Sequence, residues 1–235
     1  MDLGKYKVLS FDCYGTLIDW DAGLAGQLKR IAPDVDDDDL LQRYAVFEAD
    51  IEHRHPTMLY SDVIANAGRK LAESLDRDVS DALLADIGGS VGTWPPFPDS
   101  VAALAALKQH CDLVVLSNVD RTSFSGSSAQ LGDPFHSVLT AEDVGSYKPA
   151  AANFEALLAH IDAMGVDRSE HLHVAQSLFH DHVPAQALGI DTLWINRRAG
   201  KTSEGASGPM LDVTPDAEYT NMASFASALV DAKAG

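Results

Sequence analysis

Four short apolar runs constrain the fold of this chain more than any other feature of its sequence. They occupy residues 8–11, 113–116, 172–175 and 193–195, and helical patterns lie between the later ones. Apolar runs of this length that alternate with helices are typical of parallel strands, which are buried on both faces. The sequence therefore predicts an α/β protein built on a parallel sheet.

The interval between the first two runs is much longer than the others and contains no convincing strand. It carries amphipathic helical patterns instead, with Tyr44 on one apolar face. We expect a catalytic core made of residues 1–18 and 99–235, and a mostly helical cap made of residues 19–98. A Gly- and Ser-rich stretch at residues 199–210 predicts a surface loop.

The composition argues against several classes of partner. A chain of 235 residues that is 46% hydrophobic can bury a full core. No stretch approaches the roughly 20 apolar residues that a membrane span needs. The formal charge of -18 argues against nucleic acid, because phosphate binding requires clustered Lys and Arg. The first residues also lack the pattern of a secretory signal, so we expect a cytoplasmic protein.

The turn FDCYGTL at residues 11–17 carries the most informative side chains. Asp12 directly follows the first predicted strand, and Gly15 permits a tight exit that leaves the carboxylate at the carboxyl end of that strand. Ligands bind at this edge in open α/β sheets. Asp12 is therefore placed as a nucleophile.

Polar groups also lie at or just beyond the ends of the other predicted strands. The groups concerned are Asp12 with Thr16, Ser117 with Asn118, Lys148, and residues 176–181. The carboxyl ends of parallel strands converge on one edge of the sheet, so these segments are expected to form one polar site.

These motifs resemble those of the haloacid dehalogenase superfamily, and the turn at residues 11–17 is most similar to its L-2-haloacid dehalogenase branch. The resemblance spans nearly the whole chain. The matching segments are Asp12-Cys13-Tyr14-Gly15-Thr16, Leu116-Ser117-Asn118, Tyr147-Lys148-Pro149 and, in part, residues 175–181. The resemblance implies a Rossmann-like core with a helical cap, a 2-halo acid as a small anionic substrate, and a homodimer.

Tyr14, in the expected substrate site, separates two activities of this superfamily. Its phosphatases normally carry a second aspartate at this position, which protonates the leaving alcohol. A phenol with an unperturbed pKa of about 10 is a poor substitute, whereas most halides leave without a proton. Gln176 also replaces the superfamily's magnesium-binding aspartate. A divalent cation prefers several anionic oxygens, so we expect no metal and no cofactor.

The resemblance gives three residues a catalytic role. Asp12 attacks the carbon that bears the halogen and forms an aspartyl ester, which water then hydrolyses. Lys148 holds Asp12 ionised and orients it, while Asp181 either activates the water or supports Lys148. The predicted products are a 2-hydroxy acid and a halide ion.

Four further residues are expected near the substrate. Ser117 and Asn118 present a hydroxyl and an amide to the substrate carboxylate, and Thr16 either bonds the nucleophile or caps the exit turn. Arg43 resembles the family's halide-binding arginine by its spacing from the nucleophile and from Glu48. The alternative for Arg43 is a solvated helix residue.

Departures from the pattern of the L-2-haloacid dehalogenase branch leave the identity of the substrate open. Phe154 stands where the closest dehalogenases place a tyrosine, so contacts to the substrate carboxylate must differ. Gln176 and Leu178 replace small polar residues. His180, beside Asp181, is either an alternative base or a packing residue at a helix start.

The sequence supports three functions, of which one leads. The leading hypothesis is hydrolytic dehalogenation of short 2-haloalkanoic acids, either haloacetates or L-2-haloacids. The alternatives are a magnesium-dependent phosphatase acting on a small phosphate ester and a non-catalytic ligand-binding protein. The preferred halogen and chain length remain open.

Overall fold

The computed structural model describes residues 1–200 and 213–235, and its centre is a six-stranded sheet. The strands are β1 (Val8–Phe11), β2 (Asp112–Ser117), β3 (Ser137–Thr140), β4 (His171–Ala175), β5 (Asp191–Ile195) and β6 (Ala217–Tyr219). Their order is β3-β2-β1-β4-β5-β6, and each neighbouring pair is parallel. The predicted α/β fold with a Rossmann-like parallel sheet is confirmed.

The four predicted strands are present as β1, β2, β4 and β5, whereas the sequence pattern does not predict β3 and β6. These two strands form the edges of the sheet. Most residues of β3 are partly or fully exposed, and the three residues of β6 include none that is buried. An edge strand that is half exposed gives no continuous apolar run. Most of the loop predicted at residues 199–210 lies outside the described residues.

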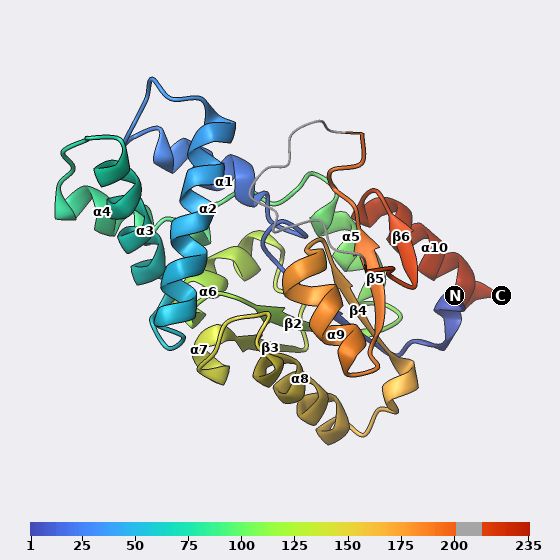
Figure 1. The fold of residues 1–235 in the computed structure, drawn as a ribbon. Helices are drawn as coiled ribbons and strands as arrows, with labels where there is room; N and C mark the ends of the chain where they lie inside the picture. The colour runs from blue at the N-terminus through green and yellow to red at the C-terminus, as the bar shows by residue number, and fades with distance from the viewer. Residues whose placement is uncertain (201–212) are drawn as a thin grey trace.

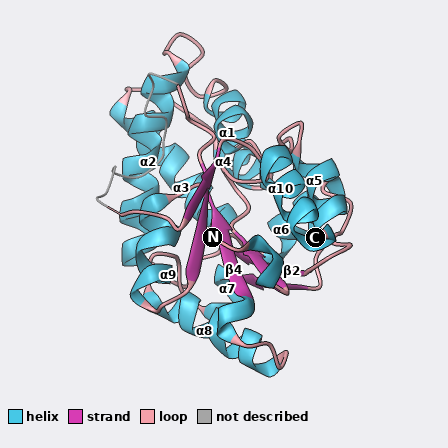
Figure 2. Cartoon of the chain, turned by 90° about the vertical axis from the view of Figure 1, so that its right-hand side faces the viewer, coloured by secondary structure: helices cyan, strands magenta, loops and turns pink. Residues whose placement is uncertain are grey.

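Side chains of the central strands alternate between two apolar layers. In β1, Leu9 and Phe11 belong to one layer and Val8 to the other. The first layer is covered by α5 (Ser100–Leu107), α6 (Arg121–Gln130) and α10 (Met222–Ala234), and the second by α8 (Ala151–Ala163) and α9 (Val183–Ala187). Figure 2 shows the strands between these helices. Burial on both faces explains the uninterrupted apolar runs of the sequence.

Four helices between β1 and α5 form the helical insert. They are α1 (Trp20–Leu28), α2 (Asp37–Arg54), α3 (Tyr60–Ser74) and α4 (Asp81–Gly88). Asp19, Asp36 and Ser80 start three of them, because their side chains accept hydrogen bonds from the first free N–H groups. Figure 1 shows the insert at one end of the molecule. These helices lie within residues 19–98, whose independence as a cap domain stays a prediction.

Hydrogen bonds hold the insert against the core at several places. Where the chain enters and leaves the insert, the two connecting segments are themselves joined, because Asp19 N donates to the carbonyl oxygen of Pro95 at 2.8 Å. Farther from this junction, the hydroxyl of Tyr147 donates to the carbonyl oxygen of Met58 at 2.6 Å. Tyr147 lies between the short helix α7 (Ala141–Val144) and α8. The insert therefore packs against the segment that carries Lys148.

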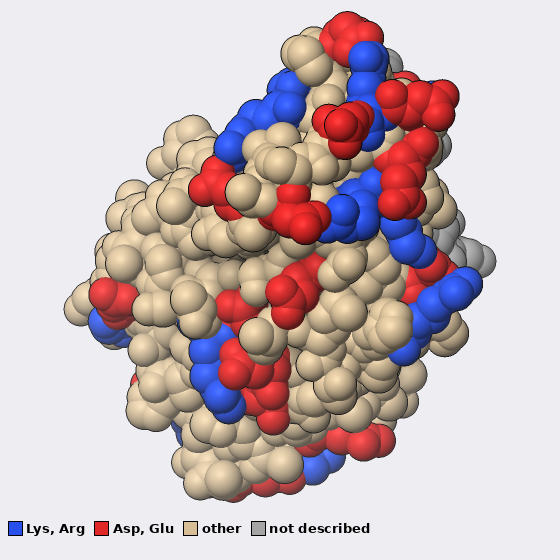
Figure 3. Space-filling view, turned by 90° about the vertical axis from the view of Figure 1, so that its left-hand side faces the viewer, with Lys and Arg blue, Asp and Glu red and all other residues tan. Residues whose placement is uncertain are grey.

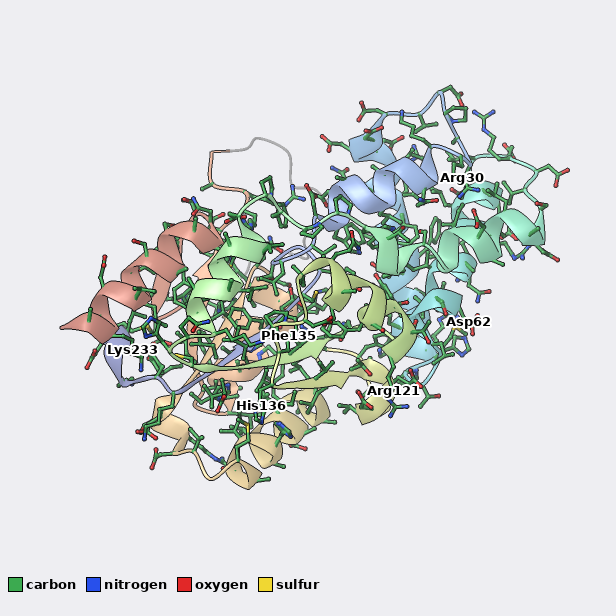
Figure 4. The ribbon with its side chains drawn as sticks, turned by 180° about the vertical axis from the view of Figure 1, so that it is seen from behind. Arg30, Asp62, Arg121, Phe135, His136 and Lys233 are labelled. Atoms are coloured by element: carbon green, nitrogen blue, oxygen red, sulfur yellow. The ribbon has the colours of Figure 1, made fainter. Side chains whose placement is uncertain are left out.

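The two ends of the chain also pack together. The ammonium of Lys233 donates to the carbonyl oxygens of Gly4 and Tyr6, at 2.9 and 2.7 Å. Figure 4 shows Lys233, on α10, beside the N-terminal segment. The last helix thus closes the layer that covers one face of the sheet.

Acidic and basic side chains are interspersed on the surface of the insert. Arg77 pairs with Asp34, and Arg69 pairs with Asp81, at 2.6 and 2.7 Å. Figure 3 shows Lys and Arg beside Asp and Glu on this side of the molecule. Within residues 1–200 and 213–235, no helix is both long enough and apolar enough to cross a membrane.

Candidate active site

The strand order of the sheet reverses at β1, which has β2 on one side and β4 on the other. In open α/β sheets, ligands bind at such a point, outside the carboxyl ends of the strands. Asp12 follows β1, Ser117 ends β2, and Gln176 follows β4. Polar groups from three neighbouring strands therefore meet at this edge, next to the start of the insert.

Lys148 lies at the centre of this group. Its ammonium donates to Asp12 Oδ1 at 2.9 Å, to Asp181 Oδ1 at 2.7 Å and to the carbonyl oxygen of Leu116 at 3.0 Å. The residue is 2% exposed. Burial lowers the pKa of Lys148, but attraction to the two carboxylates outweighs this effect and leaves the pKa raised. Lys148 is thus a charged bridge between Asp12 and Asp181.

Asp12 has both carboxylate oxygens engaged. Besides the bond from Lys148 to Oδ1, the hydroxyl of Thr16 donates to Oδ2 at 2.6 Å. Thr16 in turn accepts a hydrogen bond from Gln176 N at 2.9 Å, which ties the turn after β1 to the end of β4. Burial raises the pKa of Asp12, and the charge of Lys148 opposes this rise. Of the two roles expected for Thr16, the structure contains the bond to Asp12.

Asn118 fixes the main chain of Lys148. Its Nδ2 donates to the carbonyl oxygen of Lys148 at 3.0 Å, and its Oδ1 accepts from Lys148 N at 2.6 Å. Asn118 is therefore a positioning residue, and its expected substrate contact stays a prediction. The neighbouring hydroxyl of Ser117 is buried and has no hydrogen-bond partner within the described parts of the chain. Ser117 thus remains a candidate for substrate binding.

Asp181 comes from η4 (Leu178–His182), a single π-helical turn after β4. Such turns are frequent at functional sites. Burial raises the pKa of Asp181, but Lys148 and then His173 more than offset this effect and hold the pKa below its ordinary value. Its Oδ2 is buried and has no partner among the described residues. Asp181 is therefore an ionised carboxylate with one free oxygen.

A buried chain of hydrogen bonds runs from Asp181 into the sheet. Asp181 Oδ1 lies 3.0 Å from His173 Nε2, Ser10 Oγ lies 2.8 Å from His173 Nδ1, and His171 Nε2 lies 2.7 Å from Ser10 Oγ. A carboxylate only accepts, so His173 donates to Asp181 through Nε2. The Nδ1 of His171 has no partner among the described residues.

The chain of hydrogen bonds fixes the orientation of Asp181. Burial lowers the pKa of His171 to about 3, so this imidazole stays neutral at physiological pH. The sequence gives only a weak indication that histidines support Asp181. His171 and His173 alternate along a strand, which suggests that they share a face but does not indicate what they bind.

The hydroxyl of Tyr14 is engaged by a serine of α6. It lies 2.7 Å from Ser127 Oγ of α6, and the Tyr14 ring packs edge-on against Trp94 with 6.0 Å between the ring centres. Burial raises the pKa of Tyr14 well above its ordinary value. Tyr14 is therefore unsuited to protonate a leaving group at neutral pH.

Arg43 is not brought to the site. Its side chain is 47% exposed and pairs with Asp39 on the same helix at 2.8 Å. Its neighbour Tyr44 occupies the buried face of α2, so Arg43 points away from that face. The structure thus has Arg43 as a solvated helix residue, which matches the alternative given by the sequence, and its expected halide contact stays a prediction.

Phe154 lies beneath the site. It is fully buried in the layer under α8, and its ring packs edge-on against His173 with 5.3 Å between the ring centres. In the structure Phe154 is a packing residue next to His173, and its expected contact with the substrate stays a prediction.

His180 matches the packing role better than the catalytic one. Its main-chain N donates to Ser177 Oγ at 3.1 Å, and its Nδ1 lies 3.2 Å from the same oxygen, so Ser177 caps the turn at which His180 sits. Burial lowers the pKa of His180 to about 4. His180 is therefore a weak base at neutral pH.

Arg197 supports the nucleophile turn and is missed by the sequence analysis. Its Nε and Nη2 donate to the carbonyl oxygen of Thr16 at 3.1 and 2.9 Å, and its Nη1 binds the carboxylate of Asp99 at 2.8 and 3.0 Å. The guanidinium also stacks on Phe97, 4.1 Å from the ring centre. No motif in the sequence signals this residue, because its partners are 98 and 181 positions away.

The donor set fits a divalent cation poorly. Asp12 and Asp181 already share the ammonium of Lys148. Among the described residues there is no group of three or more His, Cys, Asp or Glu side chains able to hold a metal ion. Mg²⁺ prefers several oxygen ligands, and Gln176 contributes no charge.

Comparison with known proteins identifies the family. A family model of haloacid dehalogenase-like hydrolases matches residues 6–175. The chain belongs to this family. The match includes Asp12, Asn118 and Lys148, and ends before Asp181. No curated protein matches the sequence of this HAD-like hydrolase.

Solved structures with a similar fold include two dehalogenases and a magnesium-bound hydrolase. The L-2-haloacid dehalogenase from Xanthobacter autotrophicus with chloropropionic acid covalently bound is 19% identical, with 95% of this chain and 98% of that chain covered and a TM-score of 0.80. The defluorinating L-2-haloacid dehalogenase Rha0230 is 20% identical, with 95% of each chain covered and a TM-score of 0.78. The HAD-hydrolase YfnB from Bacillus subtilis, bound to magnesium, is 20% identical, with 95% and 98% covered and a TM-score of 0.75. At these identities the likeness shows the fold alone.

Proposed function

We propose that this HAD-like hydrolase cleaves the carbon–halogen bond of a short 2-haloalkanoic acid through an aspartyl ester at Asp12. The observation that carries the proposal is the ammonium of Lys148 bound between Asp12 and Asp181. This arrangement holds a carboxylate nucleophile at the switch point of the sheet and leaves its charge balanced by a side chain. A dehalogenase of the same fold, from Xanthobacter autotrophicus, has chloropropionic acid covalently bound.

In the first step, an oxygen of Asp12 attacks the carbon that bears the halogen. The new carbon–oxygen bond forms as the carbon–halogen bond breaks, and the halide leaves with the bonding electrons. Thr16 and Lys148 hold the carboxylate in place through the bonds to Oδ2 and Oδ1. The raised pKa of Lys148 keeps the ammonium charged throughout.

In the second step, water attacks the carbonyl carbon of the ester and releases a 2-hydroxy acid. The partner-free Oδ2 of Asp181 is available to accept a hydrogen bond from this water. One proton is released with each turnover, together with the halide. Asp12 returns to its carboxylate form with an oxygen from water.

Tyr14 and the donor set favour this reaction over phosphate ester hydrolysis. An alkoxide leaving group needs a proton, and the Tyr14 hydroxyl is bound to Ser127 and has a raised pKa. A chloride or bromide ion needs none. The homodimer and the cytoplasmic location expected from the sequence stay predictions.

The test is halide release from chloroacetate, L-2-chloropropionate and fluoroacetate in the presence of EDTA. We expect release from at least one of them and a loss of about 10⁴-fold or more in Asp12→Asn, because the neutral amide is not a nucleophile. Asp39→Asn, an exposed change on α2, is the matched control and is expected to retain activity. Turnover by a folded Asp12→Asn protein would exclude the aspartyl ester. Phosphate release that requires magnesium would favour the phosphatase, and ligand-induced stabilisation without turnover would favour a binding protein.

A further inference from the structure

One face of α2 carries two carboxylates that have no basic partner. Tyr44, Glu48 and Glu52 follow one another at intervals of four residues, so they lie along one face of the helix. Tyr44 is fully buried, and both glutamates are partly buried. Neither glutamate forms an ion pair with any residue in the described ranges, whereas Arg43 and Arg54 of the same helix pair with aspartates. Partly buried carboxylates normally have such partners.

Tyrosine hydroxyls surround these carboxylates. Tyr60 donates to Glu48 Oε1 at 2.7 Å and accepts from Trp20 Nε1 at 3.2 Å. The hydroxyl of Tyr44 has no standard hydrogen bond with any described residue. Tyr44 lies one helical turn before Glu48 on the same face, and burial, followed by the charges of Glu48 and Glu52, raises the pKa of Tyr44. A buried hydroxyl that lacks a standard hydrogen bond, next to carboxylates without a basic partner, indicates a missing ligand group.

The carboxylates of α2 lie next to the nucleophile site. The ring of Tyr147, the residue before Lys148, packs 6.4 Å from the ring of Tyr60. Burial and then the charge of Glu48 raise the pKa of Glu52, and the charge of Lys148 opposes this rise. Glu52 and the ammonium of Lys148 therefore act on each other across the boundary between insert and core. Figure 1 shows α2 running from the outer part of the insert towards the core.

We propose that Glu48 and Glu52 bind a protonated amine carried by the substrate that reacts at Asp12. An ammonium group supplies three N–H donors and a positive charge, which match two carboxylates without a basic partner. Lys148 is already shared by Asp12 and Asp181 and does not neutralise the pair. The inference rests on the proposed function and narrows the substrate to a 2-halo acid with an amino group farther along its chain.

The experiment measures binding without turnover, so that it is independent of dehalogenation. Two stable product analogues of equal length are compared by titration calorimetry at pH 8: 4-amino-2-hydroxybutanoate and 2-hydroxypentanoate. The amino compound is expected to bind at least about tenfold more tightly to the wild-type protein, which corresponds to about 1.4 kcal/mol. Glu52→Gln and Glu48→Gln are each expected to reduce this preference to about threefold or less.

Glu73→Gln provides the matched control, because Glu73 is an exposed glutamate of α3 in the same insert. It is expected to keep the full preference, and thermal unfolding of each variant confirms that it is folded. Equal affinity for the two compounds, undetectable binding of both, or a preference that survives in Glu52→Gln would overturn the inference. If the amine preference is present but no halide is released from any 2-halo acid, the inference stands and the proposed reaction fails.

Discussion

The nucleophile site of the core and the carboxylate face of α2 differ in how their charges are paired. Lys148 bonds to both Asp12 and Asp181, and Thr16 and His173 support these carboxylates from either side. Glu48 accepts a hydrogen bond from Tyr60, and neither Glu48 nor Glu52 forms an ion pair with a described residue. A site whose charges are paired within the protein keeps its geometry before a ligand arrives. A site whose carboxylates have no basic partner depends on the ligand, so we expect the core to provide the chemistry and the insert to contribute to specificity.

The largest effect is expected from breaking the pairing in the core. Lys148→Met leaves Asp12 and Asp181 buried without a cation, which is expected to destabilise the protein by about 3–5 kcal/mol at pH 7. We expect kcat/KM to fall by about 10³-fold or more, because the nucleophile is no longer held ionised and oriented. Urea unfolding and halide release measure the two effects. A stable, active Lys148→Met protein would refute the central role of the bridge.

Removing the support for Asp181 is expected to have a smaller effect. His173→Leu deletes the bond to Asp181 Oδ1 but leaves the bond from Lys148 in place. We expect kcat to fall by about tenfold with KM changed less than about threefold, because the residue positions a catalytic group and does not touch substrate. Steady-state kinetics separates the two constants. If KM rises and kcat is unchanged, Asp181 is not positioned by His173.

In the insert, a substitution at Glu48 is expected to raise the stability of the protein, in contrast to the substitution at Lys148. Burial raises the pKa of Glu48 from 4.5 to about 7, so the folded state binds this proton more tightly than the unfolded state. Stability is therefore lost as pH rises from about 4.5 through 7, because the unfolded state ionises first. Glu48→Gln cannot ionise and is expected to be about 1–2 kcal/mol more stable than wild type at pH 8, with no advantage at pH 4.5.

Unfolding curves at these two pH values check this prediction. The exposed change Glu73→Gln serves as the control, with no difference from wild type expected at either pH. Equal loss of stability in Glu48→Gln at both pH values would mean that the Tyr60 bond, rather than ionisation, dominates the role of Glu48.

The smallest effect is expected at Arg43. Its pairing with Asp39 is solvent-exposed, and exposed pairs contribute little. Arg43→Ala is expected to change kcat/KM by less than about twofold. A drop of 100-fold or more in halide release would mean that Arg43 reaches the halide during turnover, contrary to its orientation in the structure.

Sequence reasoning predicts the parts of the site that short segments contain. Asp12 and Thr16 are four residues apart on one turn, so their contact follows from local geometry. Lys148 and Asp181 are brought to Asp12 by the order of parallel strands, which the apolar runs and the family resemblance both indicate. The central strands are also predictable, because burial on both faces gives each of them a continuous apolar run in the sequence.

The residues that sequence reasoning misplaces depend on helix rotation and distant packing. The spacing from Asp12 suggests Arg43, whereas the apolar pattern of the same helix predicts a buried Tyr44, and the structure has Tyr44 on the buried face and Arg43 in solvent. Phe154 follows the lysine motif closely in the chain, yet α8 carries it under the sheet, against His173. Arg197 supports the turn at Thr16 through contacts between distant segments, for which the sequence offers no local pattern.

The most direct test of the proposed aspartyl ester at Asp12 is to determine which product receives the oxygen atom of water. Enzyme in excess over L-2-chloropropionate is allowed one turnover in water enriched in ¹⁸O. The ¹⁸O content of the peptide containing Asp12 and of the lactate product is then measured by mass spectrometry. An aspartyl ester predicts label in the Asp12 carboxylate and unlabelled lactate, because the product oxygen comes from Asp12 and water replaces it. Labelled lactate with an unlabelled Asp12 would mean that water attacks the substrate directly, and would contradict the account.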